Sequence, residues 1–227
     1  MIENLPNWID IFFTLIVFIT IAFFYFSNGK PKYLTILIIV WSLLQSLLAI
    51  NNYYQLLNTI PPRFALVLIP TTLLFIYAFQ RKQINWVLEN RNTYISTISH
   101  SVRIPVEIVL YYLFLNKMIP ELMTFEGRNF DILAGISAPI IGFLYYKKKI
   151  SKKVLLIWNI VGLCLVCFIL VNGLLSAELP IQQFGFDQPN KAVTFFPYVL
   201  LPATVVPIVI YTHITDIIKI RREIKAV

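Results

Sequence analysis

Four polar residues lie at helical spacing in the middle of the chain: His100, Arg103, Glu107 and Tyr111, at intervals of three, four and four residues. Such intervals place side chains on one face of an α-helix. Because ionisable groups are costly inside a membrane, this face is a candidate proton relay or ligand anchor. In a second interpretation, Arg103 and Glu107 form an ion pair one turn apart that neutralises both charges. Pro105 allows a different arrangement of these four residues. The helix can begin at this proline, and His100 and Arg103 then lie in the preceding turn.

A second group of polar residues falls in two loops and at the ends of two apolar segments. Its members are Glu126, Arg128, Asn129 and Asp131 in the first loop, Gln183 and Asp187 in the second, and Asn51 and Asn172 at the segment ends. The density of charge in the segment PELMTFEGRNFD predicts a polar, outward-facing vestibule that also binds the ligand. The alternative is ordinary loop polarity, with Asn129 or Asp131 capping the helix that follows.

The composition indicates that these residues are positioned by membrane helices. Of the 227 residues, 58% are hydrophobic and only 13% are charged, and the mean hydropathy is +0.75, whereas soluble domains are about a quarter charged. Continuous apolar runs favour helices over a β-barrel, and each crossing needs about 20 such residues. We predict an all-α membrane protein with seven transmembrane helices. The predicted spans are residues 8–26, 34–51, 64–79, 104–118, 132–146, 154–175 and 193–214.

Basic residues are sorted between alternate loops of this arrangement. Fifteen of the 19 lysines and arginines fall in one set of alternate loops and four in the other. Because cytoplasmic loops carry the basic excess, the N-terminus is predicted outside and the C-terminus in the cytoplasm. The net charge of +8 is therefore an orientation signal, and no nucleic-acid partner is expected. We expect a multi-pass protein of the cell inner (plasma) membrane, in contact with membrane lipids.

Two parts of the chain are related at an offset of 121 residues. Residues 10–52 align without a gap with residues 131–173 and share 11 of 43 positions, among them Asp10 with Asp131 and Asn51 with Asn172. This similarity predicts a parallel 3+1+3 repeat within a single transmembrane domain. The first three-helix unit is 1–89, the cytoplasmic loop and linker helix four are 90–120, and the second unit with a short basic tail is 121–227.

Span number, orientation and repeat together resemble the superfamily of seven-helix transporters and opsins. That superfamily includes the sugar-transporting SWEETs, vitamin transporters and microbial rhodopsins. The segments RIPVE, PELMTFEGRNFD and QFGFDQPN resemble an uncharacterised family of bacterial seven-span membrane proteins. The first resemblance implies a transport or receptor fold, and the second implies no function.

Three functions are compatible with these patterns. The first is a small-molecule transporter or permease with a polar intramembrane site on the fourth helix. The second is an intramembrane acid–base enzyme acting on a lipid or isoprenoid, since Pro105-Val106-Glu107 resembles the Pro-x-Glu of bacterial lycopene cyclases. The third is a non-catalytic receptor or assembly subunit. The small molecule, any catalytic residue and the oligomeric state are not predicted. No cofactor or metal is expected, because span 193–214 lacks a retinal-binding lysine and two histidines are too few for a ceramidase-like zinc site.

Overall fold

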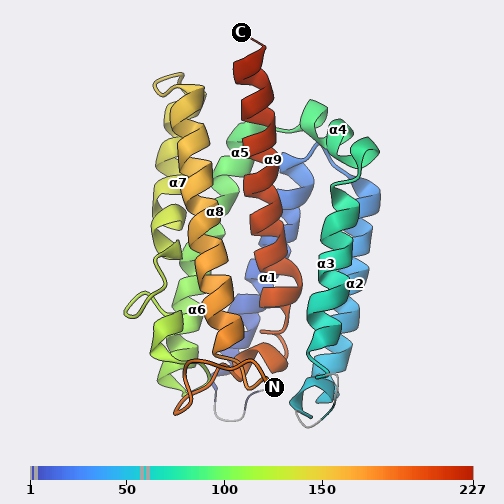
Figure 1. Cartoon of the computed structure of the whole chain (residues 1–227), viewed down its shortest axis with the longest axis vertical. Helices are drawn as coiled ribbons and strands as arrows, with labels where there is room; N and C mark the ends of the chain where they lie inside the picture. The colour runs from blue at the N-terminus through green and yellow to red at the C-terminus, as the bar shows by residue number, and fades with distance from the viewer. Residues whose placement is uncertain (1, 3–4, 57–58, 60–61, 227) are drawn as a thin grey trace.

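Helices dominate the computed structural model of the chain, which describes residues 2, 5–56, 59 and 62–226 (Figure 1). Within those residues no β-strand occurs. The α-helices are α1 (Asn7–Ser27), α2 (Lys32–Ile50), α3 (Ala65–Ala78), α4 (Arg81–Asn90), α5 (Thr93–Ser99), α6 (Arg103–Leu115), α7 (Asp131–Tyr146), α8 (Lys152–Leu175) and α9 (Val206–Lys225). The 3₁₀ turns are η1 (Tyr53–Gln55), η2 (His100–Val102), η3 (Glu121–Met123) and η4 (Ala192–Thr194), and η5 (Leu201–Val205) is a π-helical segment that leads into α9.

Five helical segments in the described ranges are long and apolar enough to cross a membrane. They are Asn7–Ser27, Lys32–Ile50, Thr93–Leu115, Lys152–Leu175 and Leu201–Lys225. Two shorter apolar helices, α3 and α7, have 14 and 16 residues. The all-helical, apolar character that the composition predicts is therefore confirmed.

The fourth and seventh predicted spans differ from the helices that form. The fourth begins at Thr93 rather than at residue 104, because η2 joins α5 to α6 and Pro105 occupies the first turn of α6, where its missing N–H is tolerated. Asn92 caps this helix by accepting a hydrogen bond from the N–H of Ile95 at 3.1 Å. The seventh begins at Leu201 rather than at residue 193, because Pro197 and Pro202 have no N–H to continue a helix between them.

α1 and α9 contact each other in the middle of the bundle, with α7 and α8 on one side and α2 and α3 on the other (Figure 1). α8 and α9 make the most extensive helix–helix contact. α4 is a short amphipathic helix that the apolar pattern did not predict, and it packs against α9 near the C-terminal end of that helix. The outer faces are strongly apolar; on α2, for example, Leu43 and Leu47 are both 59% exposed.

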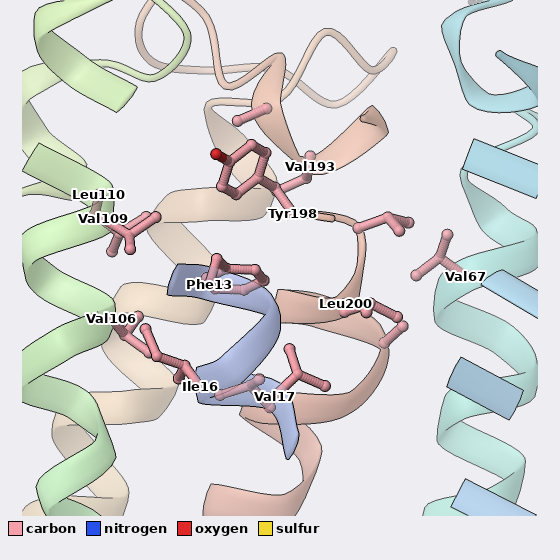
Figure 2. Packing of buried hydrophobic residues seen from close by; sticks show 14 of the residues in the cluster. Phe13, Ile16, Val17, Val67, Val106, Val109, Leu110, Val193, Tyr198 and Leu200 are labelled. Carbon is pink, nitrogen blue, oxygen red and sulfur yellow. The ribbon is translucent and has the colours of Figure 1, made fainter. Parts of the chain in front are cut away.

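The main apolar core lies where α1 meets α6 and the segment that leads into η5 (Figure 2). Phe13 of α1 packs against Tyr198, with ring centroids 5.3 Å apart. Tyr198 also donates a hydrogen bond from its hydroxyl to Oδ1 of Asp10 at 2.6 Å. This contact anchors the segment before α9 against α1, beside the cavity described below.

Candidate functional site

A buried carboxyl group on α6 is the starting point of the site. Glu107 is 2% exposed and lies about 12 Å along the helix from its end at Leu115, at 1.5 Å per residue. Its Oε1 accepts a hydrogen bond from Nδ2 of Asn129, whereas its Oε2 has no hydrogen-bond partner among the described residues. Asn129 is itself fixed, since Nδ2 also donates to the carbonyl of Met123 at 3.1 Å and Oδ1 accepts from the N–H of Asp131 at 3.2 Å.

Glu107 lines a cavity of about 70 Å³ between α6, α8 and η5. Asn129, Asp131 and Asn190 supply the other polar side chains of its wall, and the remaining lining is apolar. Asn190 is 3% exposed. Its Nδ2 donates to the carbonyl of Gly173 at 3.1 Å, and its Oδ1 has no partner within the part of the chain that is described. Two of the side chains that line the cavity, Glu107 and Asn190, therefore each have a buried oxygen atom without a hydrogen-bond partner among the described residues.

Arg103 lies one turn before Glu107 on α6 and is 3% exposed. Its Nη1 donates to Oδ1 of Asp131 at 2.8 Å, and its Nη2 donates to Nε2 of His213 at 2.6 Å. The pair between Arg103 and Glu107 that their spacing allowed is therefore replaced by a pair between α6 and α7. The two helices can approach because α7 carries Gly135 here; a Cβ at that position would lie 3.1 Å from the Cβ of Arg103.

His213 extends this network from α6 to α8 and α9. Its Nδ1 lies 2.9 Å from Oδ1 of Asn159, whose Nδ2 donates to the carbonyl of Leu155. Because Arg103 can only donate, Nε2 of His213 accepts and Nδ1 carries the hydrogen; these contacts assign a neutral imidazole. His100 stacks on this ring with centroids 3.8 Å apart and planes inclined by 13°. The nitrogen lone pairs of two stacked, parallel imidazole rings lie in parallel planes and do not converge on one point. The two rings are therefore poorly placed to bind one metal ion together.

Part of the predicted vestibule forms an open groove of about 740 Å³. Arg128, Gln183 and Asp187 line it together with Glu121, so the two polar loops do meet. Glu126 is exposed and is not part of the lining. The groove and the cavity are distinct, because their linings share no residue.

The other predicted residues have separate surroundings. Asn129 and Asp131 point into the bundle and line the cavity, as described above. Tyr111 packs against Phe125, with ring centroids 5.0 Å apart, and does not line the cavity. Asn51 is exposed and Asn172 is buried; each donates to a carbonyl one turn earlier in its own helix, and neither lines the groove or the cavity.

Sequence reasoning missed Asn159 and a second buried ionic group, and it assigned Asn190 to the vestibule, whereas this residue lines the cavity and not the groove. In that group Nε of Arg91 donates to Oδ1 of Asp216 at 2.6 Å, and both side chains are 0% exposed. Ser96 donates to the other oxygen of Asp216 at 2.7 Å, which ties α5 to α9. The available signal was the spacing of His213 and Asp216, three residues apart on an apolar helix, which places both on one face.

A second cavity, of about 60 Å³, lies among α1, α2, α3 and α9. Trp41 and Tyr211 line it, and the hydroxyl of Tyr211 is buried without a hydrogen-bond partner in the described ranges. η5 lies between the two cavities, because Pro202 faces the first and Thr204 faces the second. π-helical turns are frequent at functional sites, so η5, as the segment between the two cavities, is of functional interest.

A family model described as "Domain of unknown function (DUF8737)" matches residues 59–221. This chain belongs to that family. Glu107, Asn129, Asp131 and Asn190 all lie within the DUF8737 match, so the whole polar wall of the cavity belongs to the shared region. α1 and α2 precede it. Comparisons with curated proteins and with solved structures gave no match.

Proposed function

We propose that this DUF8737 member is a small-molecule transporter or permease of the bacterial inner membrane, with its substrate site in the cavity at Glu107. One observation carries the proposal: a cavity in a bundle of apolar helices is lined by a buried glutamate, and one of its carboxyl oxygens has no hydrogen-bond partner among the described residues. Ionisable groups inside membrane proteins mark substrate and ion pathways, since they are costly to keep there without a role.

The proposal includes seven spans, with the N-terminus outside and the C-terminus in the cytoplasm. In this arrangement the short helices α3 and α7 also cross the bilayer, with the five long segments. The sorted basic residues support this orientation. The exposed leucines and isoleucines of the outer helix faces support it as well, because lipid is the solvent that such faces require.

The 3+1+3 repeat and a transporter-like fold belong to the same proposal. Asp10 and Asp131, which the repeat pairs, are both buried near the beginning of an apolar helix, α1 and α7 respectively. Each accepts a hydrogen bond from a side chain of another segment, Tyr198 in the first case and Arg103 in the second. Similar polar anchors at corresponding positions are what a duplicated unit retains, and they favour the resemblance to seven-helix transporters.

The cavity favours a small solute over an isoprenoid substrate. By the same volume measure one water needs about 10–15 Å³, so 70 Å³ holds only a few non-hydrogen atoms. An intramembrane enzyme acting on a long polyene needs an extended apolar channel instead. The dimensions thus support transport over the cyclase-like alternative.

Uptake into liposomes tests the proposal. The purified full chain is reconstituted in phosphatidylethanolamine and phosphatidylglycerol and supplied with radiolabelled amino acids, sugars, amines and vitamins, with and without a pH gradient. We expect protein-dependent accumulation of at least one compound, its loss in Glu107→Gln, and its retention in Glu89→Gln, which alters an exposed glutamate of α4. If no compound accumulates, or if Glu107→Gln transports as well as the unmodified chain, the proposal is wrong.

A further inference from the structure

A groove of about 580 Å³ lies between the beginning of α2 and the amphipathic helix α4, at the end of the bundle where α9 also ends (Figure 1). Three lysines line it: Lys30 and Lys32 at the turn from α1 to α2, and Lys82 in the first turn of α4. Tyr33 and Trp86 are the aromatic residues of the lining. This lysine groove shares no residue with the cavity at Glu107 or with the groove of the polar loops.

The positive charge of the lysine groove is not neutralised within the part of the chain that is described. All three lysines are exposed, and none of them pairs with a carboxylate there, whereas Lys152 pairs with Glu223 at 2.9 Å. No aspartate or glutamate is among the described residues that line the groove. Because like charges gathered on one groove repel each other, an anion bound there is favourable.

The basic residues also occupy helix positions that favour the opposite charge. Lys32 is the first residue of α2, and Arg81 and Lys82 are the first two residues of α4. Neither helix has an acid in its first turn or a side chain that caps it. A helix N-terminus carries a partial positive charge, so cations are unfavourable there. An anion in the groove offsets this repulsion at both helices.

The aromatic residues and the position of the groove favour a lipid headgroup as the anion. Trp86 is 41% exposed and Tyr33 is 87% exposed, and both residue types collect at membrane–water interfaces. The groove adjoins the turn between α1 and α2, two helices long enough to cross a membrane. Basic residues on an amphipathic helix at a membrane surface are typical of anionic-lipid binding. The volume is within the range of sites for small organic molecules.

We propose that the lysine groove binds the headgroup of an anionic phospholipid. Lys30, Lys32 and Lys82 supply the positive charge for its phosphate, and Trp86 and Tyr33 supply the interfacial contacts. The proposal uses the membrane-spanning arrangement given under the proposed function, but it requires neither transport nor the cavity at Glu107. A bound lipid connects α4 to the beginning of α2, since the groove lies between them.

Binding of short-chain lipids to the purified full chain in a non-ionic detergent tests the proposal. Dioctanoyl phosphatidylglycerol is the probe, and dioctanoyl phosphatidylcholine and glycerol 1-phosphate are compared with it by calorimetry. We expect saturable binding of phosphatidylglycerol that weakens as salt is added, and much weaker binding of the other two compounds. Lys30→Gln/Lys32→Gln/Lys82→Gln should bind phosphatidylglycerol about a hundredfold more weakly, at about fivefold for each lysine.

Lys147→Gln/Lys148→Gln/Lys149→Gln is the matched control, because it removes the same charge from three exposed lysines of the loop between α7 and α8. It should bind phosphatidylglycerol normally, and both triple variants should unfold at the temperature of the unmodified chain. Trp86→Leu should weaken binding severalfold.

Four outcomes would overturn the proposal. They are no saturable binding of phosphatidylglycerol, equal affinity for phosphatidylcholine, an equal loss in the two triple variants, and glycerol 1-phosphate binding as tightly as the lipid, which would indicate a site for free phosphate compounds. The uptake assay is a separate test. Glu107-dependent uptake without selective lipid binding would retain the transporter and reject the lipid site, and selective lipid binding without uptake would do the reverse.

Discussion

Gly162 on α8 is the position where one added methyl group should disrupt the buried network most directly. A Cβ there would lie 2.6 Å from Cε1 and 2.7 Å from Nε2 of His213. The imidazole cannot move aside freely, since Arg103 and Asn159 hold its two nitrogens and His100 stacks on its face. Gly162→Ala therefore displaces the ring and strains or breaks the contact with Arg103.

The expected cost follows from three contributions. Overpacking costs about 2 kcal/mol, and losing a hydrogen bond to a charged group costs about 2 kcal/mol more. Alanine is more favourable than glycine inside a helix, and this gain offsets about 1 kcal/mol of that cost. The net loss of about 3 kcal/mol corresponds to a decrease in Tm of about 6–12 °C for a chain of this size.

Thermal unfolding of the purified protein in detergent, followed by circular dichroism at the helical minimum, measures this loss. Gly173→Ala on the same helix is the matched control, because its Cβ would meet the flexible end of Met123 at 3.0 Å; we expect no decrease in Tm. In a His213→Ala background, Gly162→Ala should lose most of its cost, because the clashing ring is absent. An equal decrease in both backgrounds, or none in either, would refute the reasoning.

Three further results are expected. Arg91→Met leaves a fully buried aspartate without its partner and should cost about 3–5 kcal/mol, whereas Lys191→Met, in a half-exposed pair, should cost at most about 1 kcal/mol; similar losses in thermal unfolding would contradict this. Tyr198→Phe removes the donor to buried Asp10 and should cost about 1–3 kcal/mol in the same assay, and an unchanged Tm would be the contrary result. Burial raises the pKa of Tyr54 to about 12, above the usual tyrosine value of about 10. The folded state should therefore lose stability as pH rises from about 10 toward 12, and denaturant titrations should show a shallower loss in Tyr54→Phe.

The apolar runs predict most of the helices, because length and hydropathy are local properties of the sequence. The beginning of the fourth span was missed since residues 93–101 are rich in serine and threonine. These hydroxyls donate to carbonyls of their own helix, as Thr97 does to Thr93 at 2.8 Å and Ser96 to Thr93 at 2.9 Å. Such internal bonds let a polar-looking segment remain helical in an apolar setting.

The site was only partly predictable for a different reason. Helical spacing correctly places Arg103 and Glu107 inside the bundle, where both are at most 3% exposed. Their partners come from a distant segment: Asp131 is the first residue of α7, and Asn129 lies in the loop just before it. Such pairing depends on the depth and rotation of α7 relative to α6, which no single segment encodes, so the spacing alone favours the local pair of Arg103 with Glu107.

The dependence of polar pairing on the depth and rotation of neighbouring helices also explains why polar contacts define the position of α9. His213 and Asp216 lie three residues apart on this helix, and each pairs with an arginine from a distant part of the chain. Apolar contacts between membrane helices discriminate weakly among registers, because lipid tails are as apolar as the side chains. A rotation or shift of α9 by one residue would instead separate Arg103 from His213 and Arg91 from Asp216 together. The two buried networks therefore fix the register of α9, and with it the position of η5 against the cavity at Glu107.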